Sequence, residues 1–177
     1  MGSPRDVDDS ELLPRFSEEE VRDAVRRIAA EISRDYAGER PLFVGVLKGC
    51  FVFLADLVRE LTIPCEVDFV RARSYGRSTE SSGSVEITKD LETDLHGRHV
   101  IVVEDIEDTG LTMDVVVDRI RSGKPTSVRR CALLVREGTP PPDYVGMEVG
   151  RGFVVGYGID YAERHRERRD IRAIPGT

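Results

Sequence analysis

Apolar residues recur with helical spacing near the beginning of the chain. Ser17 followed by Glu20 has the form of a capping box, in which the two residues satisfy free backbone N–H groups at a helix N-terminus. The apolar positions that follow lie three or four residues apart, at Val21, Ala24, Val25, Ile28 and Ile32. This spacing predicts an amphipathic helix, and Gly38 is expected to stop it.

Other segments are apolar without interruption. "PLFVGVL" (41–47) has the pattern of a strand buried on both faces in a parallel sheet, and "CFVFLADLVREL" (50–61) predicts a helix directly after it. The alternation continues with strands at 65–70, 99–104 and 127–135, a helix at 112–123, and short strands at 144–149 and 153–158. This order predicts an α/β domain with a mainly parallel central sheet flanked by helices, whose ligands bind at the carboxyl ends of the strands.

Two polar segments interrupt this pattern. "RARSYGRSTESSG" (71–83) is too long for a simple turn and is rich in Ser, Gly and Arg, so a mobile loop is expected. "KDLETDLHGR" (89–98) is expected to turn the strand at 84–88 back onto the strand at 99–104. A charged segment follows the last expected strand.

Length and composition suit one domain. The chain has 177 residues, of which 40% are hydrophobic, enough for a buried core. We expect residues 17–177 to form a single domain, and the polar, acidic residues 1–16 to be an N-terminal extension that need not be ordered. No segment has the apolar length of a membrane span or the apolar region of a secretion signal, so a cytoplasmic protein is expected.

Charge and cysteine content exclude further classes. The chain has 26 Lys and Arg residues against 33 Asp and Glu residues, a formal charge of -7, which disfavours a broad surface for nucleic acid or an anionic membrane. Its three cysteines, Cys50, Cys65 and Cys131, are widely spaced and form no CxxC pair. Neither a disulfide framework nor a zinc site is indicated, and buried free thiols are expected.

One segment places acidic residues directly after a buried strand. "VIVVEDIEDTGLT" (100–112) carries four carboxylates, Glu104, Asp105, Glu107 and Asp108. Because like charges repel, solvent, a cation or a bound ligand must offset them. Carboxylates only accept hydrogen bonds, so they suit sugar hydroxyl groups or a divalent cation.

The residues that follow suit a phosphate group. The loop after the strand leads to a helix N-terminus, where backbone N–H groups lack intrahelical partners and the helix dipole favours an anion. Gly110 lets the backbone approach a ligand closely, and the hydroxyl groups of Thr109 and Thr112 are additional donors. Phosphate, sugar and metal together indicate a ribose phosphate.

With these motifs the chain resembles the purine phosphoribosyltransferases of the hypoxanthine-guanine type. "VVEDIEDTGLT" (102–112) is similar to the family's signature for phosphoribosyl pyrophosphate. Three further matches occur in the family's order, "GVLKGCFVFLADLVREL" (45–61), "SYGRSTESSG" (74–83) and "FVVGYGIDYAERHR" (153–166). The resemblance runs from about Ser17 to Ile171, and it implies the type I fold of this family, with a small hood formed by the terminal segments.

The resemblance also implies an activity. Members transfer the 5-phosphoribosyl group from phosphoribosyl pyrophosphate to a 6-oxopurine base, hypoxanthine or guanine, and yield IMP or GMP and pyrophosphate, with Mg²⁺ as cofactor. They are usually homodimers or homotetramers. No nucleic acid or membrane partner is implied.

The same resemblance implies a set of site residues. Asp108 matches the candidate general base that faces N7 of the purine. Phosphoribosyl pyrophosphate is expected at Lys48, Gly49, Ser74, Tyr75, Glu104, Asp105, Asp108, Thr109, Gly110, Leu111, Thr112 and Arg166. The purine is expected at Ile106, Arg136, Phe153, Val154 and Asp160, and Mg²⁺ at Glu104, Asp105 and Asp160.

Some of these roles are more specific. In the family, the peptide bond before the residue matched by Lys48 is often cis, and the backbone there contacts pyrophosphate, as does the residue matched by Arg166. Ser74 and Tyr75 match a flexible lid that closes over the reacting centre. Phe153 matches a ring that stacks on the purine.

Arg136 departs from the family pattern, which commonly has a lysine that contacts the purine 6-oxo group. The guanidinium can also donate to that oxygen, but Arg136 can equally end its strand and pair with Glu137 or solvent. A xanthine-preferring phosphoribosyltransferase is therefore an alternative. A nucleotide-sensing, RNA-binding regulator of the same fold is another, and the charge of -7 disfavours it.

Overall fold

The first helix forms as predicted. The computed structural model describes residues 7–75 and 84–177, and α1 spans Glu18–Asp35. The Glu20 N–H donates to Ser17 Oγ at 3.2 Å, and the Ser17 N–H donates to Glu20 Oε2 at 2.8 Å, so the capping box is present. The apolar side of α1 is buried in the core through Val21, Ala24, Val25, Ile28, Ala29 and Ile32.

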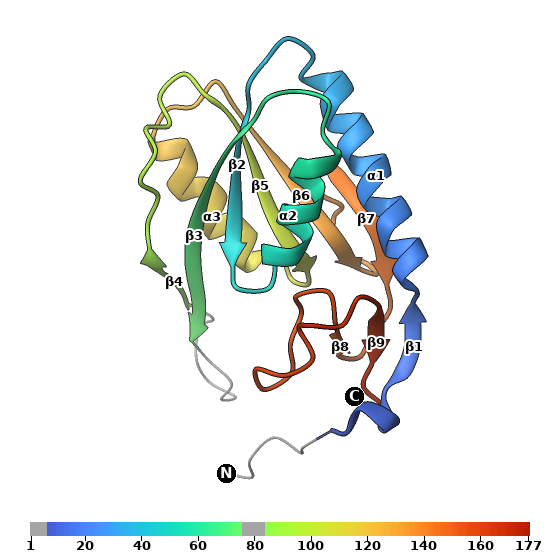
Figure 1. The fold of residues 1–177 in the computed structure, drawn as a ribbon. Helices are drawn as coiled ribbons and strands as arrows, with labels where there is room; N and C mark the ends of the chain where they lie inside the picture. The colour runs from blue at the N-terminus through green and yellow to red at the C-terminus, as the bar shows by residue number, and fades with distance from the viewer. Residues whose placement is uncertain (1–6, 76–83) are drawn as a thin grey trace.

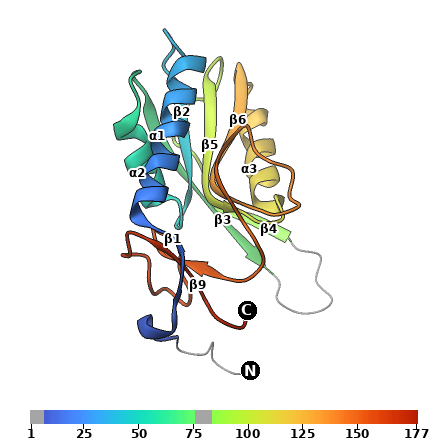
Figure 2. The ribbon, with the colours of Figure 1, turned by 90° about the vertical axis from the view of Figure 1, so that its right-hand side faces the viewer.

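Among the described residues, the central sheet has six strands. They are β2 (Leu42–Leu47), β3 (Glu66–Tyr75), β4 (Ser84–Lys89), β5 (His99–Glu107), β6 (Ser127–Arg136) and β7 (Tyr144–Val149), in the order β4-β3-β2-β5-β6-β7. All neighbours are parallel except β3 and β4. α1 and α2 (Phe51–Glu60) cover one face and α3 (Leu111–Ser122) covers the other (Figures 1 and 2). The predicted α/β fold is confirmed.

The central strands β2 and β5 are buried on both faces. Successive side chains of a strand point to opposite sides of the sheet, so each strand contributes to two cores. Phe43, Ile101 and Val103 pack in the core that contains α1 and α2. Leu42, Val44, Val100 and Val102 pack against α3. This double burial explains the continuous apolar runs of the sequence.

The predicted pairing of residues 84–88 with 99–104 is wrong. β4 lies antiparallel to β3, with Ser74 opposite Val85, because both edges of β5 are occupied by β2 and β6. Residues 71–75, expected in a loop, extend β3, since β4 supplies their backbone partners. The rest of the expected loop, 76–83, lies outside the described residues.

In the part of the chain that the structure describes, a second, three-stranded antiparallel sheet lies near the carboxyl ends of the main strands (Figure 1). It consists of β1 (Leu13–Phe16), β9 (Ile171–Ala173) and β8 (Val154–Val155) in that order. The sheet joins segments from both ends of the chain, as expected for the hood. Residues 13–16, expected in an extension that need not be ordered, are instead a strand whose backbone pairs with β9.

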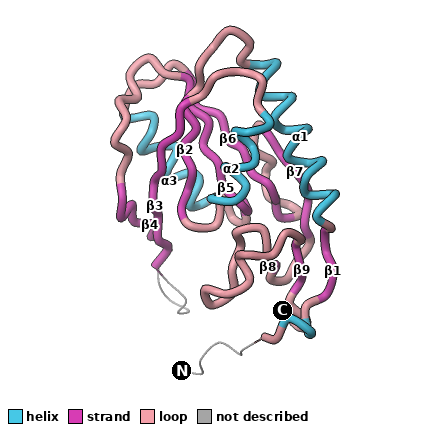
Figure 3. The backbone as a smooth tube through the Cα atoms, in the orientation of Figure 1, coloured by secondary structure: helices cyan, strands magenta, loops and turns pink. Residues whose placement is uncertain are grey.

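The segment after β8 was expected to continue as a strand to residue 158, and this is wrong. Gly156 and Gly158 have φ angles of 105° and 98°, which turn the chain away from the extended conformation. Residues between β8 and β9 run mostly as loops and turns beside the carboxyl ends of the main strands (Figure 3). Within the described residues, no helix is both long and apolar enough to cross a membrane.

Candidate active site

The acidic motif lies where β5 leads into α3. Glu104 and Asp105 are in the second half of β5, residues 108–110 form a short loop, and α3 begins at Leu111. Gly110 has a φ of 78°, a left-handed conformation that favours glycine, and the Leu111 N–H donates to Thr109 Oγ1 at 3.4 Å. The first N–H groups of a helix lack intrahelical partners, so this loop can hold an anion.

Gly49 brings the loop after β2 directly against this motif. A Cβ atom on Gly49 would lie 1.9 Å from Oδ2 of Asp105, so only glycine fits beside that carboxylate. A Cβ atom on Gly158 would lie 2.3 Å from the carbonyl oxygen of Gly49. Two glycines therefore allow the loop after β2 to lie between the end of β5 and the segment after β8.

Charged side chains of the segment after β8 reach the same place. Arg166 Nη2 lies 2.7 Å from Asp160 Oδ1 and 3.2 Å from Glu163 Oε2. Arg166 Nη1 donates to the carbonyl oxygen of Gly158 at 2.8 Å. Lys48 Nζ lies 3.0 Å from Glu163 Oε2. Lys48 and Arg166 thus share one carboxylate, that of Glu163.

Arg136 contacts the loop of the acidic motif. Its Nε lies 3.4 Å from Asp108 Oδ1, and its Nη1 donates to the carbonyl oxygen of Gly150 at 2.5 Å. Thr139 Oγ1 donates to the carbonyl oxygen of Asp108. The side chain of Asp108 is 68% exposed, whereas that of Arg136 is 16% exposed. Arg136 is therefore held inside the protein, while the carboxylate beside it remains accessible.

The two carboxylates at the end of β5 lie in an environment that disfavours their charge. Burial is the main cause that raises the pKa of Glu104 well above its ordinary value, and the neighbouring carboxylates of Asp105 and Glu107 raise it further. Burial raises the pKa of Asp105 to about 6, although backbone N–H groups and the Arg166 guanidinium oppose this change. A bound cation or hydroxyl donor would stabilise both ionised groups.

Comparison with known proteins agrees with this geometry. A family model described as the phosphoribosyl transferase domain matches residues 17–162. The chain belongs to the phosphoribosyl transferase family. The matched span includes the loop after β2 and the acidic motif, while Arg166 lies just beyond it.

Individual relatives match over most of the chain. The hypoxanthine-guanine phosphoribosyltransferase of Bacillus subtilis (strain 168) is 45% identical over 155 residues, covering 85% of this chain and 86% of that protein. The enzyme of the same name from Aquifex aeolicus (strain VF5) is 38% identical over 175 residues, covering 96% and 98%. A solved structure of the Trypanosoma cruzi hypoxanthine phosphoribosyltransferase in complex with the product IMP has a TM-score of 0.84 at 36% identity, covering 98% of each chain.

One feature expected at the loop after β2 is present. The peptide bond that precedes Lys48 is cis. Gly49, Asp105, Asp160 and Arg166, which lie far apart in the sequence, converge beside Lys48 through the contacts described above. Their roles toward a substrate remain predictions.

The residues expected to hold the purine differ in exposure. Phe153 is 39% exposed, and its ring lies edge-on to that of Tyr161 with centroids 5.9 Å apart. Val154 is buried in β8, and Ile106 packs partly buried against the core. Because Phe153 is partly exposed, its ring is accessible to a ligand. The ring of a fully buried core aromatic residue would not be accessible.

The expected lid is described only at its beginning. Ser74 and Tyr75 end β3 and pair with Val85 and Ser84 of β4. The remaining residues of the lid, 76–83, lie outside the described part of the chain. The closing motion therefore stays a prediction from the sequence.

Glu107 differs from the other three carboxylates of the motif. It is 2% exposed, and Arg130 Nη1 lies 3.4 Å from its Oε1. Arg130 also pairs with Asp114 of α3, while Glu107 Oε2 has no hydrogen-bond partner among the described residues. The negative charge of Glu107 is therefore offset by an arginine of the protein itself, Arg130. Glu107 thus supports the loop from the side of α3.

Sequence reasoning missed two residues of the site. Glu163 holds both Lys48 and Arg166, yet it lies in a turn-rich charged segment without apolar periodicity. Gly158 packs against Gly49, but in the sequence Gly156 and Gly158 are conspicuous only as an incomplete dinucleotide motif, since Tyr161 replaces its third glycine. No local pattern reports either contact.

The carboxylates suit a magnesium ion that is also bound by substrate. Among the described residues, no three His, Cys, Asp or Glu side chains are grouped to hold a metal by themselves. Mg²⁺ usually binds through one or two carboxylates together with substrate phosphates and water. The negative charge of Asp160 repels that of Asp105 and contributes to the raised pKa of Asp105. The two carboxylates fit such a shared site.

The raised pKa of Asp105 predicts that Asp105→Asn stabilises the ligand-free protein. Between the ordinary pKa of 3.8 and the folded-state pKa of about 6, the folded protein binds this proton more tightly than the unfolded chain does. The free energy of unfolding therefore falls as pH rises through this window. At pH 7.5 the variant is expected to gain about 1 to 3 kcal/mol, measured by urea denaturation.

The pH dependence separates this effect from a general benefit of removing charge. The gain should shrink as pH falls toward 4 and vanish below the ordinary pKa of 3.8, where the parent's carboxyl becomes protonated in the unfolded chain as well as in the folded protein. Asp118→Asn, an exposed position on α3, serves as the control and should show no comparable gain. A gain from Asp105→Asn that is equal at pH 4 and pH 7.5 would contradict the raised pKa.

Proposed function

We propose that this phosphoribosyl transferase acts in purine salvage, transferring the 5-phosphoribosyl group from phosphoribosyl pyrophosphate to hypoxanthine, guanine or both, and yielding IMP or GMP and pyrophosphate. The observation that carries the proposal is the contact of Gly49 with Asp105 beside Lys48 and Arg166. This contact places three kinds of group around one phosphate-binding loop. They are a backbone that a ligand can approach closely, a pair of carboxylates and two cationic side chains. The relatives named above support the choice of a 6-oxopurine.

Each part of phosphoribosyl pyrophosphate has a matching group. The loop 108–112, with its free N–H groups and the hydroxyl groups of Thr109 and Thr112, takes the 5′-phosphate. Glu104 and Asp105 accept hydrogen bonds from the ribose hydroxyl groups. The pyrophosphate lies against the Lys48–Gly49 backbone and Arg166, and Ser74 and Tyr75 begin the lid over it.

The leaving group explains why cations gather on one side. Breaking the bond between ribose C1 and pyrophosphate places negative charge on the leaving group, and Arg166 and Lys48 can offset it. Both are paired with Glu163 in the free protein, so the entering pyrophosphate replaces that carboxylate. Glu104, Asp105 and Asp160 would hold Mg²⁺ together with substrate oxygens, and the bound ion would neutralise further charge on the pyrophosphate.

Asp108 acts on the purine side of the reaction. Its exposed carboxylate takes the proton from N7 as N9 of the purine bonds to C1, which is general base catalysis. Phe153 stacks on the purine with Ile106 on the opposite face, Val154 offers backbone groups to the base edge, and Asp160 lies close by. Arg136 donates to the 6-oxo group.

A steady-state panel of bases tests the function. Adenine, guanine, hypoxanthine, xanthine and uracil would each be supplied with phosphoribosyl pyrophosphate and Mg²⁺, and pyrophosphate release measured. Turnover with hypoxanthine or guanine is expected, and a marked preference for xanthine would support the alternative substrate. No turnover with any base, from protein shown to be folded, would refute the proposal.

Arg136→Ala is expected to weaken binding of the purine selectively. The variant loses a charge-assisted donor, so the KM for the purine should rise by the equivalent of about 1.5 to 3 kcal/mol, with a much smaller change in the KM for phosphoribosyl pyrophosphate. Discrimination against 6-amino bases should also weaken. Arg129→Ala, on the same strand but paired with Asp143 at the surface, is the matched control. If the purine KM and the rejection of adenine are unchanged, Arg136 has only a structural role.

A further inference from the structure

The loop that presents Arg166 has a backbone conformation that needs support. Ala162, Glu163 and His165 have φ angles of 53°, 64° and 71°, in the left-handed region that residues with a Cβ atom rarely adopt. Such residues persist only where surrounding contacts hold them. The contacts that hold this loop therefore decide where the Arg166 guanidinium points.

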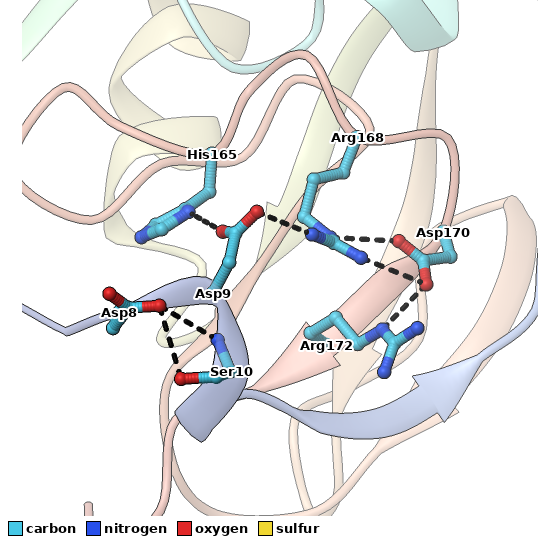
Figure 4. A network of polar contacts seen from close by, with 7 residues as sticks. All are labelled: Asp8, Asp9, Ser10, His165, Arg168, Asp170 and Arg172. Carbon is cyan, nitrogen blue, oxygen red and sulfur yellow. Dashed lines mark hydrogen bonds and ion pairs between the residues drawn. The ribbon is translucent and has the colours of Figure 1, made fainter.

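Asp9, from the N-terminal segment, contacts the loop on both sides of Arg166. Its Oδ1 lies 2.8 Å from Nδ1 of His165, and its Oδ2 accepts from Nη1 of Arg168 at 3.1 Å (Figure 4). His165 is 7% exposed, so the contact lies partly inside the protein. Arg168 is held further by Asp170, which also binds Arg172 (Figure 4).

The segment that carries Asp9 is itself anchored. Asp9 begins a 3-10 helix, Asp9–Glu11, which is capped by the side chain of Asp8 through the Ser10 N–H at 3.0 Å. On either side of this helix, Val7 and Leu12 are buried with apolar residues of the hood. The carboxylate of Asp9 is therefore presented from a fixed position.

The backbone transmits this anchoring to Arg166. The Gly158 N–H donates to the carbonyl oxygen of Arg166 at 3.0 Å, and the Tyr157 N–H donates to that of Arg168 at 2.9 Å. Asp9 holds residues 165 and 168, so Arg166 lies in a short segment that is fixed at both ends. This segment lies beside Gly158, which packs on Gly49.

We propose that Asp9 is a positioning residue for Arg166, tying the N-terminal segment to the pyrophosphate side of the active site. The proposal rests on the pyrophosphate role of Arg166 given above. Asp9 does not contact the substrate; it holds His165 and Arg168 so that the guanidinium of Arg166 points toward Asp160 and Glu163. Because the Asp9 side chain is 59% exposed and contacts at the surface contribute little to global stability, the main effect of removing Asp9 falls on this loop.

Binding of magnesium pyrophosphate to the whole protein, measured by calorimetry, provides the first test. Asp9→Ala is expected to weaken binding by roughly tenfold, because Arg166 is no longer held in position. Glu11→Ala, in the same short helix but outside the network of Figure 4, should bind as the parent does. In an Arg166→Ala background, Asp9→Ala should cause no further loss. An unchanged affinity, or the same loss in both backgrounds, would overturn the proposal.

Hydrogen exchange of the loop tests the same idea without any ligand. Amides of residues 161–168 should exchange faster in Asp9→Ala than in the parent, while the melting temperature falls by less than about 4 °C. If Asp9→Ala does not fold, Asp9→Asn provides the same comparison with a side chain of similar shape. Unchanged exchange in the loop overturns the positioning role even in an active enzyme. If the loop exchanges faster in Asp9→Ala but the parent transfers no phosphoribosyl group, the proposed function is overturned and the positioning role is not.

Discussion

Asp108→Asn should lower kcat on the order of a hundredfold or more, with only a modest change in affinity for phosphoribosyl pyrophosphate. Asparagine keeps the shape of the side chain but cannot take the N7 proton of the purine. The loop should keep its position, because Thr139 binds the backbone carbonyl of Asp108 and not its side chain. The measurement is the rate of the chemical step, by single-turnover kinetics if product release limits kcat.

The exposed neighbour Glu137 provides a control for this experiment. Glu137→Gln also replaces a carboxylate with an amide, close to Arg136 but without a proposed role, and kcat should stay near that of the parent. If the single-turnover rate of Asp108→Asn equals that of the parent, the proton acceptor is a different group.

Gly49→Ala is expected to lower kcat/KM by roughly a hundredfold, because small displacements of catalytic groups have large effects on rate. The new Cβ atom would lie 1.9 Å from Oδ2 and 2.4 Å from Cγ of Asp105, so the carboxylate or the loop must move. The loop cannot easily retreat, since its carbonyl oxygen already packs against Gly158. Such overpacking should also destabilise the protein by about 1 to 3 kcal/mol.

Gly150→Ala is the matched control, because among the described residues no atom beyond its chain neighbours lies within 4 Å of the position of its Cβ, and its φ is not in the left-handed region. Steady-state kinetics and urea denaturation of both variants, side by side, check the prediction. Parent-like kcat/KM and stability in Gly49→Ala would show that the loop accommodates a side chain, and that its close approach to Asp105 is not needed.

Features that depend on neighbouring residues were predictable from the sequence. The capping box of Ser17 and Glu20 and the helical spacing after it lie within one segment, and α1 forms accordingly. The loop proposed to bind phosphate was also recognisable, since a strand, a glycine-containing loop and a helix N-terminus follow each other directly along the chain. Local hydrogen bonding and side-chain periodicity are enough to specify such units.

Predictions failed where a strand could pair with more than one partner. Residues 84–88 are a suitable strand for either β3 or β5, and only the occupation of both β5 edges decides for β3. β1 and β9 are too short to show a period of their own, and they exist as strands because β1 pairs with β9 and β9 also pairs with β8. Pairing in a sheet is a contact between distant segments, which sequence periodicity does not report.

The sequence by itself determined the α/β class, the position of the acidic motif at a strand end, and the residue types suited to phosphate, ribose and metal. Only the tertiary structure decided which of them meet. β2 lies beside β5 although β3 and β4 separate them along the chain, and this placement brings Gly49 to Asp105. Asp9 reaches Arg168 across 159 positions only because the hood joins both ends of the chain. Composition and spacing record the chemistry of each residue, but the distance between two such residues depends on how all the elements between them pack.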